Sequence, residues 1–409
     1  MDGKQRQLAL RILLPVGIGT SLSLVGDASL YAVLPTHVEA AGVPVATVGI
    51  LLSANRFVRL VLNGPIGVAY GRASRRRLFV LALFVGALST AIYALTRGFW
   101  PLLIGRLLWG LAWAGIWVGG NTMMVEVSDG AERGRWIGLF QTFFFLGASG
   151  GALFGGLLTD AIGYHLTMGV AAALTLLGGL IALACLPENR RREPDASDAA
   201  PACQEPRLGL SPAIVVAFAL HGGNRLAVAG VLNATLGLLL QEQLGAQVQI
   251  AGRSLGVATL TGSGLGLGTL ISMGSAPLLG ALSDRTATRW GVVAAGLIPG
   301  IVGFGLLTVG TPWSILAGVP LTAVTSGSNL SLSTTLIGDL TKASQQSKRL
   351  GLLFTVGDLA SAVGPPLAYA LMPVVGLKGD YLLSAGVFAA IFVAALSLAT
   401  RKEGQHADM

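Results

Sequence analysis

The chain has 409 residues, of which 53% are hydrophobic and only 11% are charged, whereas an ordinary soluble domain carries about 25% charged residues. Uncharged runs such as Leu78–Thr96, Trp136–Thr159 and Ser254–Ser283 are each long enough to supply the roughly 20 residues that span the hydrocarbon core of a bilayer. The composition therefore excludes a soluble protein and predicts an all-α polytopic membrane protein.

The 27 Lys and Arg residues outnumber the 19 Asp and Glu residues, and the net charge is +8. In a soluble protein this balance would suggest nucleic-acid binding. Here most basic residues fall in segments that are cytoplasmic if the N-terminus lies inside, as the positive-inside rule describes. We therefore predict no nucleic-acid partner, and a multi-pass protein of the cell inner (plasma) membrane with both termini cytoplasmic. The first apolar segment follows no small-residue cleavage site and is predicted to be an anchor.

Twelve apolar segments are predicted to be helices, six on each side of a polar, proline-containing stretch. The first six run approximately over Leu10–Pro35, Ala46–Tyr70, Leu78–Leu95, Trp100–Val125, Trp136–Leu158 and a segment ending at Leu186. The last six run approximately over Ser211–Leu240, Ser254–Leu282, Trp290–Val309, Pro312–Ile337, Leu350–Val375 and Tyr381–Thr400. The predicted domains are an N-terminal six-helix bundle (1–187), a cytoplasmic linker (188–210) and a C-terminal six-helix bundle (211–409).

Two loops carry related sequences, GVAYGRASRRR at Gly67–Arg77 and GALSDRTATR at Gly280–Arg289. The second begins 213 residues after the first, and the same offset carries Gly138 onto Gly351 in another pair of helices. One offset at two distant places indicates that the chain arose by duplication of a six-helix unit.

The second loop resembles the cytoplasmic loop signature G-x-L-x-D-R-x-x-x-R of the major facilitator superfamily, with Gly280, Asp284 and Arg285 in matching positions. The resemblance implies twelve transmembrane helices in two pseudo-symmetric six-helix bundles. It also implies that the loop is a gate, whose Asp pairs with basic groups and holds the two halves together in one state. In the first-half copy Gly67 and Arg72 match, but a glycine stands in the Asp position. The alternative is that the arginines of this loop only fix the topology.

The fourth helix contains IGRLLWGLAW, which resembles the R-x-x-x-G pattern of the same superfamily, with Arg106 and Gly110 in place. In proton-coupled exporters of that group the arginine is linked to proton exchange. Arg106 lies about 9 Å and Asp27 about 12 Å from the same membrane face, so the two can meet, and a buried arginine normally has a partner. The hypothesis is that Asp27 is the protonatable group and Arg106 its counter-charge. The alternative is a static ion pair that joins two helices.

Polar side chains inside the second and seventh helices are candidates for the substrate cavity. They are Arg56, Arg59, Asn63, His221, Arg225 and Asn233. The first three fall at i, i+3 and i+7, on one stripe of a helix, and Asn233 corresponds to Asp27 in the repeat if one loop absorbs seven extra residues. His221 and Arg225 share a face beside Gly222-Gly223, where we expect a helix break of the kind at which secondary transporters bind substrate.

The arginines predicted inside the spans outnumber the acids. Against Arg56, Arg59, Arg106 and Arg225 stand only Asp27 and Asp358. An excess of positive charge suits an anionic substrate. The alternative is that Arg56 or Arg59 pairs with one of the acids and never meets substrate. Asp358 is a second candidate for proton coupling.

The fifth helix reads GASGGALFGG at Gly147–Gly156. It resembles the exporter-associated pattern G-x-x-x-G-P-x-x-G-G of the superfamily, with Ala152 where proline is usual. Small residues every four positions would let the fifth and eighth helices pack closely. The resemblance favours export, and generic glycine packing is the alternative.

These patterns together predict a secondary active transporter most like the twelve-helix drug and metabolite proton antiporters. We expect proton-coupled efflux of a small organic molecule by alternating access, with proton-coupled uptake or exchange of an organic anion as the alternative. The expected partners are the substrate, protons and the lipid bilayer, and the protein is expected to be a monomer. No soluble-enzyme motif and no pair of metal ligands beside His221 is found. We therefore expect no enzyme activity, no metal and no cofactor other than the proton gradient. A membrane receptor or intramembrane enzyme is a further alternative, disfavoured by the duplicated gate loop.

Overall fold

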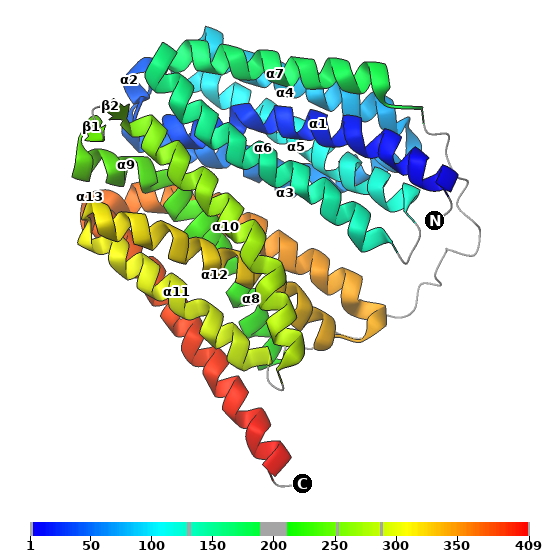
Figure 1. The fold of residues 1–409 in the computed structure, drawn as a ribbon, viewed down its shortest axis with the longest axis vertical. Coiled ribbons are helices and arrows are strands. Elements are labelled where there is room, and N and C mark those ends of the chain that lie inside the picture. The colour runs from blue at the N-terminus through cyan, green and yellow to red at the C-terminus, as the bar shows by residue number, and fades with distance from the viewer. Residues whose placement is uncertain (1–2, 129–131, 189–210, 251–252, 287–288, 408–409) are drawn as a thin grey trace.

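The computed structural model describes residues 3–128, 132–188, 211–250, 253–286 and 289–407. The first half consists of six long helices and a short one, α2 (Val38–Ala41). The long helices are α1 (Gly3–Val33), α3 (Val45–Arg72), α4 (Arg75–Leu95), α5 (Phe99–Val127), α6 (Arg133–Ile162) and α7 (Tyr164–Cys185). They pack side by side in the upper part of Figure 1.

The second half repeats the pattern. Its helices are α8 (Pro212–Asn224), η2 (Arg225–Leu232), α9 (Asn233–Leu244), α10 (Val257–Arg285), α11 (Arg289–Val309), α12 (Pro312–Asp339) and α13 (Ala343–Ala407). The first three form one continuous span, Pro212–Leu244. Within the described residues eleven helices are long and apolar enough to cross a membrane, but α13 contains a non-helical residue, Gly376, with φ 71°. Two helices meet there, and the twelve expected helices are present.

Two local features differ from the sequence-based expectation. The seventh span does not break at Gly222-Gly223. It continues as an α-helix and widens into the π-helix η2 from Arg225 onward. An antiparallel hairpin that was not expected, β1 (Gln247–Ile250) and β2 (Arg253–Gly256), precedes α10. Of the predicted linker 188–210, all but residue 188 lies outside the described residues, so the domain boundaries stay predictions.

Local chemistry explains where several helices begin. Ser74 caps α4 through a hydrogen bond from the Arg77 amide, and Thr311 caps α12 in a reciprocal capping box with Ser314. Such caps satisfy amide groups that have no partner inside the helix. Gly163 has φ 84° between α6 and α7, a conformation that favours glycine. It allows the two helices to follow each other with almost no loop.

The molecule has two distinct ends. We call the end that carries β1 and β2 the hairpin end, and the end where α1 begins the terminus end (Figure 1). At the hairpin end one apolar cluster takes residues from both halves, including Leu30, Tyr31, Ala234 and Tyr369. Two larger clusters lie within the first and the second half respectively. The halves therefore share buried apolar contacts at the hairpin end.

Glycines on α3 show that the contact between the halves does not continue along the bundle. Gly49, near the hairpin end, lies against the backbone of Pro365, so a Cβ at Gly49 would fall 2.7 Å from its carbonyl oxygen. Gly64 follows about four turns later on the same face, and no atom lies within 4 Å of its Cβ position. The same holds for Gly67 and Gly71. Among the described residues, α3 meets the second half toward the hairpin end and leaves it toward the terminus end.

Candidate functional site

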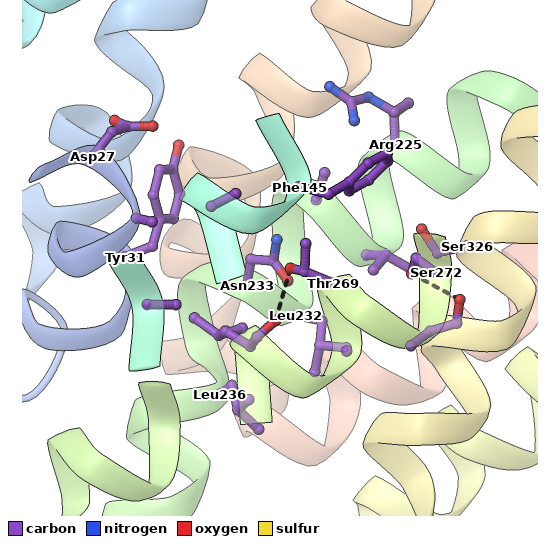
Figure 2. Close-up of a pocket in the computed structure, with 18 of the residues that line it drawn as sticks. Asp27, Tyr31, Phe145, Arg225, Leu232, Asn233, Leu236, Thr269, Ser272 and Ser326 are labelled. Carbon is purple, nitrogen blue, oxygen red and sulfur yellow. Dashed lines mark hydrogen bonds between the residues drawn. The ribbon is translucent and has the colours of Figure 1, made fainter. Parts of the chain in front are cut away.

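A cavity of about 300 Å³ lies between the halves. Figure 2 shows Asp27 and Tyr31 of α1 on one side of it, and Arg225 and Asn233 of the seventh span on another. Its lining also includes Arg56, Arg59, Trp113, Phe144, Phe145, Thr269 and Ser272. Both halves contribute charged or polar groups, so a bound molecule would touch both.

Asp27 and Arg106 form an ion pair at the edge of this cavity. Arg106 Nη1 lies 2.5 Å from Asp27 Oδ1, so the contact predicted from their depths is present. The Arg106 side chain is fully buried, and it also donates to the carbonyl oxygens of Leu51 and Leu52 on α3 at 2.9 and 3.2 Å. The Asp27 side chain is 18% exposed and lines the cavity. Arg106 is thus fixed by three acceptors, while its partner faces the cavity.

Tyr31 connects this ion pair to a second arginine. The guanidinium carbons of Arg56 and Arg106 lie 5.2 and 5.7 Å from the centroid of the Tyr31 ring, within the range of cation–π attraction. The Tyr31 hydroxyl donates to the Leu52 carbonyl at 2.7 Å, the same oxygen that accepts from Arg106. The ring therefore keeps the two arginines in a defined relation to each other.

Three arginines connect to the second half in different ways. Arg56 donates to the carbonyl oxygens of Ser361 and Ala229. Arg59 Nη2 lies 2.6 Å from Asp358 Oδ1, and Arg225 Nη2 lies 3.9 Å from the same oxygen. Of the two alternatives left open by the sequence, pairing of Arg59 with Asp358 is therefore present in the structure. Asp358 is bound from both halves at once.

Two of the predicted cavity residues lie elsewhere. His221 is buried within the second half, with Nδ1 3.1 Å from Ser333 Oγ and its ring against the position of Gly357. Neither His221 nor Asn63 is among the residues that line the cavity, whereas Asn233 is. Helical spacing placed His221 on the face of Arg225, but the transition to the π-helix at Arg225 separates their surroundings.

The glycine pattern of the fifth helix packs mainly on α1. Cβ atoms added at Gly147 and Gly151 would lie 2.6 and 2.7 Å from the Cα atoms of Ser21 and Val25 on that helix. Gly155 meets Ser29 in the same way, and Gly156 alone lies against α10, at Ala258. The expectation that the four-residue spacing serves the fifth and eighth helices is therefore wrong for most of the stripe. The spacing brings α6 onto α1, next to the turn that carries Asp27.

The two gate loops lie at the terminus end and make ion pairs within their own halves. Arg75 pairs with Glu126 at 2.6 Å in the first half, and Arg289 with Asp339 at 2.9 Å in the second. The two acids are related by the offset of 213 residues, so the duplication extends to their ion pairs. Asp284 adds a contact to Arg289 at 3.1 Å. Arg72 and Arg285 are exposed, and no ion pair of Asp284 with the first half is present among the described residues.

Sequence reasoning missed the aromatic side of the cavity. Trp109, Trp113 and Trp117 stack along α5 with ring centroids 5.9 and 5.7 Å apart. Phe144 of α6 lies 5.9 Å from Trp113 and 5.2 Å from Trp117. The signal was present, because three tryptophans at i, i+4 and i+8 share one helix face. They stand in the apolar face of a membrane helix, where aromatic residues are expected in any case.

Comparisons with known proteins agree with this architecture. The family model described as Major Facilitator Superfamily matches residues 16–273 and 226–408. The tetracycline resistance protein, class B, of Escherichia coli is 25% identical over 362 residues, covering 85% of each chain. A probable 4-methylmuconolactone transporter of Cupriavidus pinatubonensis is 33% identical over 114 residues, which are 28% of this chain and 27% of that one.

A crystal structure of a bacterial homologue of the human lysosomal transporter Spinster shares the fold, with a TM-score of 0.78 at 15% identity over 95% of this chain and 96% of that chain. The expected fold class is thereby confirmed, and the chain is a multi-pass secondary transporter, not an enzyme. Since the family model matches well over half of its residues in two overlapping segments, the chain belongs to the Major Facilitator Superfamily.

Proposed function

We propose that the protein exports a small organic molecule in exchange for protons, with Asp27 as the group that binds and releases the proton. The observation that carries this proposal is the unequal surroundings of the Asp27–Arg106 pair. Asp27 reaches the cavity, and Arg106 is fully buried on backbone carbonyls. Asp27 can therefore exchange a proton with cavity water while Arg106 stays in place.

The arrangement of the halves fits alternating access. They touch toward the hairpin end, and α3 leaves the second half toward the terminus end. With both termini cytoplasmic in the inner membrane, as the charge distribution predicts, this state opens the cavity toward the cytoplasm. Rocking of one half against the other would then expose the same cavity to the outside. The similarity to a protein named for tetracycline resistance favours export over uptake.

The test uses everted membrane vesicles with an acidic interior and a fluorescent reporter of internal pH. Lipophilic cations, neutral drugs and organic acids are added in turn to wild type, to Asp27→Asn and to Glu39→Gln, an exposed acid outside the cavity. A substrate is expected to collapse the gradient in wild type and in Glu39→Gln, but not in Asp27→Asn. Proton movement that persists in Asp27→Asn would rule out the proposed role of this residue.

A second candidate function is proton-coupled uptake or exchange of an organic anion, and the balance of charge in the cavity favours it. Arg56, Arg59 and Arg225 line the cavity, with Asp27 as the acid that faces it. In the vesicle experiment this candidate predicts that only organic acids move protons. Transport of the acid in the opposite direction, down an inward proton gradient in right-side-out vesicles, would then separate uptake from export.

A further inference from the structure

One arginine of the cavity differs from the others in its hydrogen bonding. Arg56 donates to two carbonyl oxygens, and Arg59 donates to Asp358 at 2.6 Å. Arg225 makes no hydrogen bond to any of the described residues. Its only charged contact is Asp358 at 3.9 Å, on an oxygen that Arg59 already occupies. The Arg225 side chain is 33% exposed, about twice as much as that of Arg59, and it lines the cavity (Figure 2).

The local charge balance leaves Arg225 in excess. Asp27 neutralises Arg106, and Asp358 neutralises Arg59. Arg225 is left with a share of one carboxylate that is too far away for a hydrogen bond. A guanidinium group has five N–H donors in a planar fork that matches a carboxylate. In the low dielectric between two helical bundles, an anion that reaches these donors forms a strong charge-assisted hydrogen bond.

Across the cavity stands a surface of a different kind. Trp113, Phe144 and Phe145 line it, and the first two belong to the stacked aromatic group of α5 and α6. Aromatic faces attract flat rings in offset or edge-to-face arrangements, and their negative faces do not attract a carboxylate. This aromatic wall comes from the first half, whereas Arg225 comes from the second. The amide of Asn233 also lines the cavity and makes no hydrogen bond to the described residues.

We infer that the cavity binds a planar aromatic carboxylate, with the acid group on Arg225 and the ring against Trp113 and Phe144. The volume of about 300 Å³ lies at the lower end of the range for small-molecule sites, which corresponds to an acid with one or two rings. Because the two contacts come from different halves, such a ligand bridges them. The inference rests on the transport function proposed above and adds the chemical class of the substrate.

The test measures binding by calorimetry to the purified full-length protein in detergent, without any gradient. The probes are 1-naphthoate, its neutral amide 1-naphthamide, cyclohexanecarboxylate and tetraphenylphosphonium. We expect 1-naphthoate to bind wild type more tightly than the amide by roughly ten- to a hundredfold, the value of a hydrogen bond to a charged group. This comparison needs no variant, so it holds even if substitutions impair folding.

Variants then assign the two contacts. Arg225→Gln is expected to weaken 1-naphthoate by a similar factor and to leave the amide unchanged, and Arg225→Lys to keep part of the affinity. Trp113→Leu is expected to weaken both ring compounds by roughly two- to tenfold and to spare cyclohexanecarboxylate. The control is Arg77→Gln, whose side chain is 83% exposed at the terminus end.

Three results would overturn the inference: equal binding of acid and amide, unchanged 1-naphthoate binding in Arg225→Gln, or binding of tetraphenylphosphonium alone. These failures differ from failure of proton exchange. If 1-naphthoate binds as expected and moves protons equally well in Asp27→Asn vesicles, the substrate class stands and the role of Asp27 falls. If cations alone collapse the gradient and Asp27 is needed, export stands and the aromatic acid falls.

Discussion

Gly156 of α6 is the position where one added methyl group should change the conformation of the transporter. A Cβ at Gly156 would lie 2.7 Å from the carbonyl carbon of Ala258 and 3.1 Å from the Cα of Thr259, both on α10. Carbon atoms normally approach to about 3.5–4.0 Å, so the two helices must separate by about 1 Å. Both neighbours are backbone atoms, which cannot turn aside as a side chain can.

Overpacking of this kind costs about 1–3 kcal/mol. The cost arises only while α6 and α10 touch at the hairpin end, so Gly156→Ala should shift the population away from the state seen here. Because 1.4 kcal/mol corresponds to a factor of ten, the expected shift is about five- to a hundredfold. Gly138→Ala provides a matched control. It lies five turns away on the same face of α6, and no atom lies within 4 Å of its Cβ position.

The assay is labelling of a cysteine at Thr269, a cavity residue, with a membrane-impermeant maleimide. The background has serine in place of Cys185 and Cys203. Labelling rates are compared in everted and right-side-out vesicles. Gly156→Ala should slow labelling through the terminus end and speed labelling through the hairpin end, and Gly138→Ala should match the parent. Equal rates in Gly156→Ala and Gly138→Ala would refute the reasoning.

Three further predictions concern stability, and thermal unfolding in detergent checks each. Asp27→Ala should destabilise by about 3–5 kcal/mol, because it leaves the buried Arg106 charge without its carboxylate, and Asp27→Asn should cost less, since its amide oxygen still accepts; equal melting temperatures would contradict this. Arg289→Gln breaks only partly exposed pairs and should cost at most about 1 kcal/mol. Burial lowers the pKa of His37 below its usual 6.5, against an opposing effect of Asp160; the stability it contributes is therefore present above pH 6.5 and lost as the pH falls below it, so His37→Gln should melt with a smaller loss between pH 7.5 and 5.5 than wild type.

The sequence predicted the features that depend on depth and repetition. The ion pair of Asp27 with Arg106 followed from counting residues along two helices, because both positions fall at a similar depth. The paired acids Glu126 and Asp339 obey the offset found in the glycines. These inferences succeed because a membrane fixes the length and direction of every span.

The sequence did not predict what depends on rotation about a helix axis. His221 was expected in the cavity and lies within the second half instead, because the seventh span changes from α to π geometry at Arg225. The glycines of α6 were assigned to the eighth helix, but most of them lie against α1. Periodicity tells which residues share a face and does not tell which neighbour that face meets. The aromatic wall was missed for the same reason.

Tyr31 joins two parts of the molecule that the candidate mechanism must keep in step. Its ring lies beside Arg106, the partner of Asp27, and beside Arg56, which bonds to Ser361 and Ala229 in the other half. A proton arriving on Asp27 would thus alter a cluster that also fastens one half to the other. Thermodynamic linkage makes such an effect reciprocal: separation of the halves must change the proton affinity of Asp27 by the same factor. Tyr31→Leu would then leave each site intact and loosen the exchange ratio, so that protons leak without cargo.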